Sequence, residues 1–230
     1  MYQRTHHRRI WTVLQCLNAD LLRDKECYFG GGTAIALAHG EFRESRDIDF
    51  LVSDVSSYRD LRAMVKKLGP RSLFAGTRAV HLPDCFSNDE YGIRGWVMVD
   101  GHPIKFELVH EGRISLTTPD PTERIGRVST LTRPDMVAEK LMANSDRFAD
   151  PSTFQRDLLH LAFMTIKNLD KRLGFEIAKA AYGDAIDRDL GLAVSTFLDS
   201  PLWLDRCIRT LGIAVEPTDV KARVQQLAGL

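Results

Sequence analysis

The chain has 230 residues and equal numbers of basic and acidic side chains, 31 of each, so its formal net charge is zero. This balance argues against a broad surface for long nucleic acids, although it leaves room for a local basic groove. The hydrophobic fraction of 44% is enough to bury one large core or two small ones. The four scattered cysteines, the lack of an 18-residue apolar run and the lack of a secretory signal predict a cytoplasmic protein that does not enter a membrane.

The first elements follow from simple periodicity. Residues 1–8 are polar and are predicted to be a frayed, solvated start. Apolar side chains then recur at helical spacing from Ile10 to Leu21, which predicts one amphipathic helix. The next stretch, Tyr28 to Val52, predicts a strand, a glycine turn, a short helix over residues 33–38, a polar loop and a second strand beginning near residue 47.

Two carboxylates stand in the second of these strands. Because side chains alternate along a strand, Asp47 and Asp49 face one side while Ile48 and Phe50 face the core. Strand geometry places the two carboxylates roughly 6–7 Å apart. At an effective dielectric of about 20, their repulsion is on the order of 2–3 kcal/mol. A divalent cation such as Mg²⁺, which prefers carboxylate oxygens and substrate phosphates, would offset it.

The glycines before the short helix fit the same chemistry. A helix that begins just after glycines offers free backbone N–H groups to an anion, and glycine lets a phosphate approach the backbone. Thr33 is a suitable N-cap residue. Gly31, Gly32 and Thr33 are therefore candidates for nucleotide binding. Taken separately, a glycine run is usually a turn and Asp-x-Asp is usually a surface feature; their order and spacing make the functional interpretation stronger.

A β-rich segment follows a helix predicted over residues 56–68. Residues 79–82 predict a short strand, and residues 93–99 and 104–109 predict a hairpin turning at Asp100-Gly101. Glu107 lies in the second hairpin strand and is the candidate third carboxylate of a metal site. The alternative is that Glu107 is an exposed edge-strand residue paired with Lys105 or Arg94.

From residue 132 onward the pattern is helical. A helix starting near Thr132 breaks at Asp150-Pro151-Ser152, and the next is predicted from Phe154 to Ile166. Further amphipathic segments are predicted over residues 174–182, 184–198, 201–211 and 217–227. The sequence thus predicts an α/β (α+β) fold, with an N-terminal lobe of residues 1–120 built on a small mixed sheet and an all-α lobe of residues 121–230.

The residues Gly31-Gly32-Thr33-Ala34, Arg43, Ser45 and Asp47-Ile48-Asp49-Phe50 resemble the first motif of DNA polymerase beta-like nucleotidyltransferases. More narrowly they resemble the AbiEii/AbiGii toxin branch, whose pattern is GGTALAL…R.S.DIDF. Residues 139–164 resemble the second conserved region of that branch, roughly K…DR…D…RDL.DL. His160 departs from it, since the branch usually has an aspartate there, and any catalytic role for that position is therefore in doubt.

The resemblance implies an active site. Asp47, Asp49 and Glu107 would bind Mg²⁺ or Mn²⁺, with Glu111 as the fallback for the third acid. Lys140 and Arg147 would contact the triphosphate of an NTP, for which lysine serves as a point charge and arginine as a bidentate donor. Asp157 would act in acid–base chemistry or orient Lys140 or Arg147, whereas Arg43 or Ser45 would bind phosphate or fix the loop before Asp47. Without the resemblance, the residues of the second region are also explained as a solvated helix face with ion pairs.

These residues predict metal-dependent transfer of a nucleotidyl group from an NTP to an acceptor hydroxyl. The resemblance implies the toxin of a bacterial toxin–antitoxin or abortive-infection system, acting on tRNA or another RNA and paired with a separately encoded antitoxin. Two alternatives stay open: a small-molecule nucleotidyltransferase of the antibiotic-modifying kind, and a catalytically idle nucleotide-binding or interaction module.

Overall fold

The computed structural model describes residues 1–165 and 167–229 and divides the chain into two compact units. Unit 1 comprises residues 1–38 and 45–132, and unit 2 comprises residues 39–44 and 133–230. The predicted division into domains of residues 1–120 and 121–230 stays a prediction, because compact packing alone does not establish an independently folding domain. None of the helices in the described part of the chain has the length and apolar character needed to cross a lipid bilayer.

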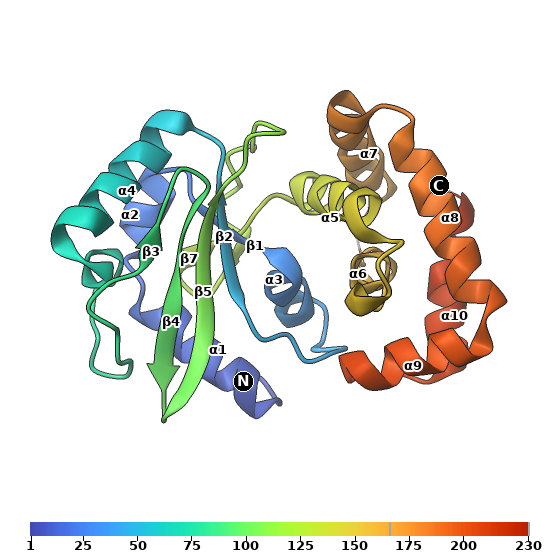
Figure 1. The fold of residues 1–230 in the computed structure, drawn as a ribbon, viewed down its shortest axis with the longest axis horizontal. Helices are drawn as coiled ribbons and strands as arrows, with labels where there is room; N and C mark the ends of the chain where they lie inside the picture. Colours follow the sequence, from blue (N-terminus) through green and yellow to red (C-terminus); the bar gives the residue numbers. More distant parts are fainter. Residues whose placement is uncertain (166, 230) are drawn as a thin grey trace. The chain divides into compact units, whose positions relative to one another are not determined.

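Unit 1 is built on a mixed five-stranded sheet in the order β1-β2-β5-β4-β3, in which β2 and β5 run parallel and the other neighbours antiparallel. Figure 1 shows these strands beside one another. The predicted α/β class with a small mixed sheet is confirmed. The strands of the unit are β1 (Tyr28–Gly30), β2 (Ile48–Val52), β3 (Ser87–Asn88), β4 (Gly92–Val99), β5 (His102–His110), and the separate ribbon of β6 (Arg124–Ile125) and β7 (Val128–Ser129).

One face of this sheet forms the core of unit 1. Phe50 of β2 and Phe106 of β5 are fully buried on it, and their rings lie 5.7 Å apart. Helix α1 (Thr5–Cys16) contributes buried side chains, and Figure 1 shows it passing behind the strands. The other helices of the unit are α2 (Ala19–Asp24), α3 (Gly31–Ala38), α4 (Val55–Leu68) and the 3-10 turn η1 (Pro70–Leu73). The opposite face of the sheet keeps polar side chains, as alternation along strands requires.

Several predicted elements of unit 1 need correction. The polar start is not frayed, since α1 begins at Thr5, and the predicted helix over residues 10–21 is two helices. The break falls at Leu17, which is extended and bridges to Phe74, and Asn18 then caps α2 by accepting a hydrogen bond from Leu21 N. The strand predicted over residues 79–82 is reduced to a single bridge between His81 and Met98.

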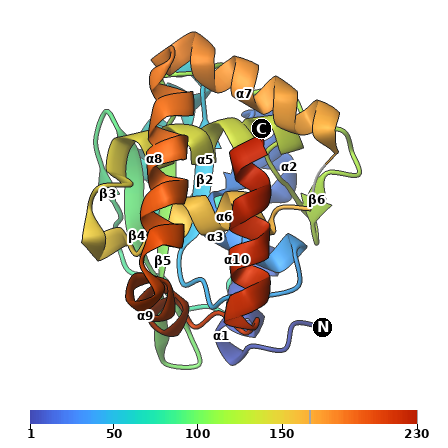
Figure 2. The same ribbon diagram turned by 90° about the vertical axis from the view of Figure 1, so that its right-hand side faces the viewer.

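The described regular elements of unit 2 are all helices, as predicted for most of the C-terminal part. The prediction that the whole of residues 121–230 is all-α was wrong, because residues 124–129 pair as β6 and β7 and belong to unit 1. Its elements are α5 (Arg133–Arg147), η2 (Pro151–Thr153), α6 (Arg156–Phe163), α7 (Asn168–Tyr182), α8 (Ala185–Asp199), α9 (Pro201–Leu211), α10 (Pro217–Gln225) and η3 (Gln226–Gly229). Helix α5 packs against α6, α7 and α8. Figure 2 shows α8 and α10, which are in contact, running side by side.

Two helix boundaries in unit 2 differ from the prediction. Helix α6 starts at Arg156 because Phe154 and Gln155 both adopt left-handed backbone conformations, which a helix does not tolerate. It ends at Phe163, and the predicted end at Ile166 lies outside the described residues. Helix α7 begins six residues before the predicted start at Gly174, because that glycine is not a helix boundary. A Cβ added to Gly174 would lie 2.5 Å from Val137 Cβ, so glycine allows α7 to approach α5 closely.

The segment of residues 39–44 packs with unit 2, although the chain on both sides of it belongs to unit 1. The Phe42 ring stacks on Phe163, with centroids 4.3 Å apart, and its carbonyl accepts a hydrogen bond from Ala214 N. His39 Nδ1 accepts from Thr165 N at 3.3 Å. The stretch just before the Asp47-Ile48-Asp49 strand is therefore fixed by helical residues that are distant in sequence.

Candidate functional site

The paired strands β2 and β5 bring two of the predicted acids together. Asp49 lies directly opposite Glu107 in the parallel register, and Ile48 lies opposite Phe106. Opposed residues project from the same face, and neighbouring strands are about 4.8 Å apart, so the two carboxylates stand side by side. Asp47 immediately precedes β2 and is exposed, while Ile48 is fully buried in the opposite direction. The alternation predicted for this strand is confirmed.

The carboxylate of Asp49 lies against the start of α3. Gly30 is the cross-strand partner of Asp49, and Gly31 follows with φ of 68°. A Cβ added to Gly31 would lie 2.3 Å from Asp49 Oδ2, a distance that no side chain could accept. Glycine is therefore required at position 31 both by the backbone conformation and by the approach of the acid. Helix α3 starts at Gly31, two residues before the predicted start.

Thr33 has a different role from the predicted N-cap, because it is the third residue of α3. Its hydroxyl donates to the carbonyl oxygen of Asp47 and lies 2.8 Å from Ser45 Oγ. Thr33 and Ser45 are both buried. These contacts tie the loop that carries Asp47 to the helix that begins at Gly31, and they occupy the hydroxyl of Thr33, one of the candidates for nucleotide binding.

The same loop is fixed by a residue that the sequence did not single out. His7 is fully buried, and its Nε2 accepts a hydrogen bond of 3.0 Å from Ser45 N. His6 Nε2 lies 3.0 Å from the carbonyl oxygen of Arg46. Two adjacent histidines in a polar N-terminal stretch gave no signal for this role, since the partner is a backbone N–H 38 residues away.

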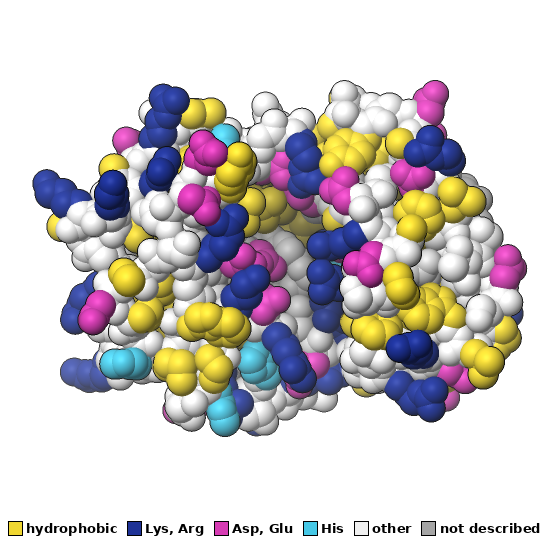
Figure 3. All heavy atoms as spheres, in the orientation of Figure 1, with side chains coloured by type: hydrophobic (Ala, Val, Ile, Leu, Met, Phe, Trp, Pro, Cys, Tyr) yellow, Lys and Arg dark blue, Asp and Glu magenta, His cyan; other side chains and the backbone are white. Residues whose placement is uncertain are grey.

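Glu107 is held by cations. Its carboxylate accepts from Lys105 Nζ at 2.6 Å and from Arg94 Nε at 3.2 Å, and Arg94 also pairs with Asp89. The hydrogen bond to Glu107 raises the pKa of Lys105, and the charges of Asp47 and Asp49 add to this effect, so Lys105 stays protonated. The ion pairs of the alternative explanation are thus present, on the same face as the aspartates. The edge-strand part of that alternative was wrong, because β5 lies between β2 and β4. Figure 3 shows acidic and basic side chains gathered over β2, β5 and β4.

The donors present match the chemistry of a magnesium site, since all three are hard carboxylate oxygens on one face of one sheet. In the arrangement that residues 1–165 and 167–229 adopt, however, no three side chains converge closely enough to hold a metal ion. Glu107 would have to exchange Lys105 or Arg94 for the ion. Glu111, the fallback acid, is 3% exposed and binds Arg113 through both carboxylate oxygens, with a shortest distance of 2.6 Å.

A second cluster of predicted residues lies within unit 2, around Asp157. Its carboxylate accepts from Lys140 Nζ at 3.0 Å and from Arg147 Nε at 2.7 Å, and Asp157 and Lys140 are both buried. Burial acts to raise the pKa of Asp157, but the charge of Lys140 and the hydrogen bond from Arg147 outweigh it and hold the pKa well below its usual range. Asp157 is therefore ionised at neutral pH and paired with two cations. The orienting role and the acid–base role both stay predictions.

His160 joins the Arg43 side chain to this cluster. Arg43 Nε donates to His160 Nε2 at 2.9 Å, so the ring proton is on Nδ1, which lies 3.7 Å from Asp157 Oδ1. Burial and the charge of Arg43 lower the pKa of His160 well below its ordinary value, so the ring is neutral. The histidine that replaces the expected aspartate thus accepts a hydrogen bond from Arg43, and Arg43 acts in unit 2 by fixing residues 39–44.

Solved structures and a family model resemble this chain. JHP933 from Helicobacter pylori, a solved structure, aligns over 100% of this chain and 94% of its own with a TM-score of 0.52 and 14% identity. MenT4, a nucleotidyltransferase toxin from Mycobacterium tuberculosis, aligns over 99% and 86% with a TM-score of 0.47 and 15% identity. No curated protein matches the chain. A family model described as nucleotidyl transferase AbiEii toxin, type IV toxin–antitoxin system, matches residues 12–206.

The fold and the family match define the class of the protein: it is an enzyme, a nucleotidyltransferase. The chain belongs to the AbiEii family of nucleotidyltransferase toxins. The family implies an NTP as substrate and an antitoxin as partner in a type IV system.

The close approach of Gly31 and Asp49 can be tested with Gly31→Ala. The added methyl group has to displace the Asp49 carboxylate, so we expect nucleotidyl transfer to fall at least 100-fold, roughly the effect of misplacing a catalytic group by 1 Å. The matched control is Gly101→Ala, which has a similar φ of 74° but no heavy atom within 4 Å of the added Cβ. It should show the backbone cost of about 1 kcal/mol in unfolding free energy and keep its activity. Equal activity of the two variants would contradict the proposed constraint.

The Asp157 cluster predicts a pH-dependent loss of stability. Asp157→Ala leaves the buried Lys140 without its carboxylate and should lower the unfolding free energy by about 3–5 kcal/mol at pH 7. Because the folded pKa is depressed, the stabilisation is complete above the unfolded pKa of about 3.9 and declines as the pH falls below it. The difference in melting temperature between wild type and variant should therefore shrink in acid.

Asp187→Ala is the control for that measurement. This substitution removes an ion pair with Lys179 in which the Asp187 side chain is 53% exposed. It should lower the unfolding free energy by no more than about 1 kcal/mol. A melting temperature of Asp157→Ala equal to that of Asp187→Ala would show that the buried cluster does not stabilise unit 2.

Proposed function

We propose that this toxin transfers a nucleotidyl group from an NTP to a hydroxyl of tRNA or another RNA, using Mg²⁺ or Mn²⁺ bound by Asp47, Asp49 and Glu107. The observation that carries the proposal is the register of β2 and β5, which sets Asp49 beside Glu107 on the open face of the sheet, next to the start of α3. Both NTPs and tRNA are abundant in the cytoplasm, where we propose that the protein acts.

The metal, when bound, would neutralise charge on the phosphates and align the reacting oxygens. The chain itself supplies positioning. Gly31 and Gly32 offer backbone N–H groups at the start of α3 to the terminal phosphates of the NTP. Thr33 contributes its backbone and, through its hydroxyl, fixes the loop of Asp47. His7 and Ser45 hold the same loop, so they are positioning residues.

We also propose a role for Lys105 and Arg94 in charge balance, which the sequence did not suggest. In the absence of an ion they neutralise Glu107, which reduces the repulsion between the three acids. When Glu107 binds an ion, Lys105 and Arg94 are left beside the reaction centre as cations able to meet phosphate oxygens. Electrostatic positioning of this kind is the main catalytic resource in phosphoryl and nucleotidyl transfer.

For Lys140 and Arg147 the family resemblance is the support for binding of the triphosphate. Their bonds to Asp157 mean that a phosphate would have to compete with a buried carboxylate. We therefore propose Asp157 as the residue that orients both cations, and not as a general base.

The choice between Glu107 and Glu111 as the third acid decides this proposal. Glu107→Gln should remove nearly all transfer activity and should leave the apo protein within about 1 kcal/mol of the wild-type stability, because its ion pairs are partly exposed. Glu111→Gln should destabilise the protein, since it breaks a buried contact with Arg113, but should keep its activity per folded molecule. Labelled NTP, Mg²⁺ and total tRNA provide the assay.

Binding of the ion gives a readout independent of turnover. Mg²⁺ or Mn²⁺ should raise the melting temperature of the wild type, and this shift should disappear in Asp49→Asn and in Glu107→Gln. A metal-induced shift that survives in Glu107→Gln and vanishes in Glu111→Gln would reverse the assignment.

A further inference from the structure

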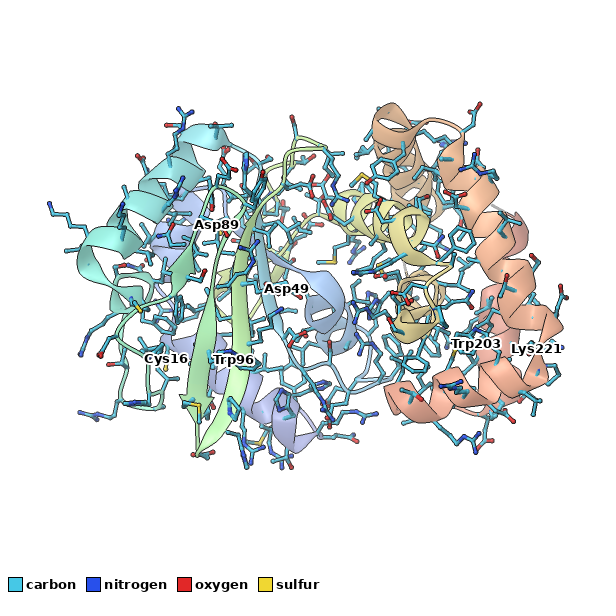
Figure 4. The ribbon with its side chains drawn as sticks, in the orientation of Figure 1. Cys16, Asp49, Asp89, Trp96, Trp203 and Lys221 are labelled. Atoms are coloured by element: carbon cyan, nitrogen blue, oxygen red, sulfur yellow. The ribbon has the colours of Figure 1, made fainter. Side chains whose placement is uncertain are left out.

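Trp96 has an unusual position for a large aromatic side chain. It lies in the middle of β4 and is 55% exposed, whereas Val97 and Val99 of the same strand are buried. Alternation along the strand puts Trp96 on the open face together with Arg94, the face that carries the acids. Figure 4 shows the labelled Trp96 and Asp49 on β4 and β2 of the same sheet. Exposing an indole costs burial free energy that a purely structural role would not require.

The register fixes the distance from Trp96 to the acids. Trp96 is opposite Lys105 on β5, and Arg94 is opposite Glu107, which is in turn opposite Asp49 on β2. Two strand spacings separate β4 from β2, about 10 Å, and Trp96 is displaced from that row by two residues, about 7 Å. The indole is therefore too far from the acids to contact the reacting atoms. It is close enough to meet a base linked to them by one or two nucleotide units.

The strand order decides which substrate that base belongs to. In the sheet order β1-β2-β5-β4-β3, Asp49 and Glu107 lie on β2 and β5, between β1 and β4. Gly31 and the N–H groups of α3 follow β1 on one side of them, whereas Trp96 is on β4, on the other side. Since the triphosphate of the NTP is assigned to the glycines, the β4 side is left for the acceptor.

The charges around Trp96 suit a polyanionic acceptor. Lys105 is the cross-strand neighbour of Trp96, and Arg94 lies two residues before it on the same face. An aromatic ring flanked by cations is the usual arrangement for binding single-stranded nucleic acid, in which the base stacks and the cations meet the phosphates. Both cations are paired with Glu107 in the ion-free protein, and they become available to phosphate when Glu107 binds an ion.

We propose that Trp96 is a stacking platform for an unpaired base near the 3′ end of an RNA acceptor, and thereby determines the acceptor class. The inference rests on the proposed function for the position of the reacting hydroxyl. Trp96 is a specificity-determining residue in this scheme, since it touches the acceptor and not the reacting atoms.

The test measures binding without turnover. A short single-stranded oligoribonucleotide with a free 3′ hydroxyl and a 5′ fluorophore is titrated with the full-length protein in the presence of Mg²⁺ and the absence of NTP. Trp96→Ala should weaken binding roughly 10- to 100-fold, the effect of losing one stacked base, while Trp96→Phe should restore much of it. Tyr91→Ala, which removes another ring that is 66% exposed, is the matched control and should bind like wild type.

A second oligoribonucleotide with abasic 3′-terminal nucleotides separates stacking from general attraction. It should bind wild type more weakly than the parent oligonucleotide does, and Trp96→Ala should no longer distinguish the two. Trp96→Ala binding as well as wild type, the same abasic penalty in both proteins, or no binding of any oligonucleotide would each overturn the inference.

Failure of the proposed function would look different. Trp96-dependent binding without any nucleotidyl transfer would leave the stacking platform standing and refute the activity. Transfer to RNA with an unchanged KM for the acceptor in Trp96→Ala would support the activity and refute the stacking platform.

Discussion

The parallel pairing of β2 with β5 is the constraint on which the site depends. A shift of one residue in that register would turn Glu107 into the core and bring Phe106 or Leu108 beside Asp49. The register is secured by the buried aromatic side chains on the opposite face, where Phe50 packs on Phe106. The hydrophobic core thus sets the geometry of the acids, although no core residue touches them.

Within unit 1, two features reduce the electrostatic repulsion between the acids on one face of the sheet. Lys105 and Arg94 neutralise Glu107, and the start of α3 presents its positive end near Asp49, beside a glycine that leaves room for the carboxylate. The same cations lie between the acids and Trp96. One face of three neighbouring strands therefore carries the acids, the cations that pair with Glu107 and the exposed ring of Trp96.

Much of this arrangement was predictable from the sequence. The order strand, glycines, helix and strand was correct, as were the hairpin with its turn at Asp100-Gly101 and the helical nature of the C-terminal part. These features depend on local signals: apolar periodicity, glycine and the alternation around Asp47-Ile48-Asp49. The family followed from the same short stretch and is confirmed by the match to residues 12–206.

What the sequence missed depends on contacts between residues distant in the chain. The buried His7 accepts a hydrogen bond from Ser45 N, and the break between α1 and α2 coincides with the bridge from Leu17 to Phe74. The binding of Arg43 by His160 joins residues 117 positions apart. No local pattern encodes such partners, so the metal ligands and nucleotide contacts assigned to these regions stay predictions.

The packing of residues 39–44 has a consequence for folding during translation. Phe42 stacks on Phe163, Arg43 binds His160, and the Phe42 carbonyl accepts from Ala214 N. While the chain is being made, residues 39–44 stay without these partners until Phe163 and His160, and finally Ala214, have been synthesised. Long-range contacts of this kind form late in folding. A nascent or truncated chain that lacks these helical residues therefore leaves residues 39–44, and the start of the loop that leads to Asp47, without their anchors.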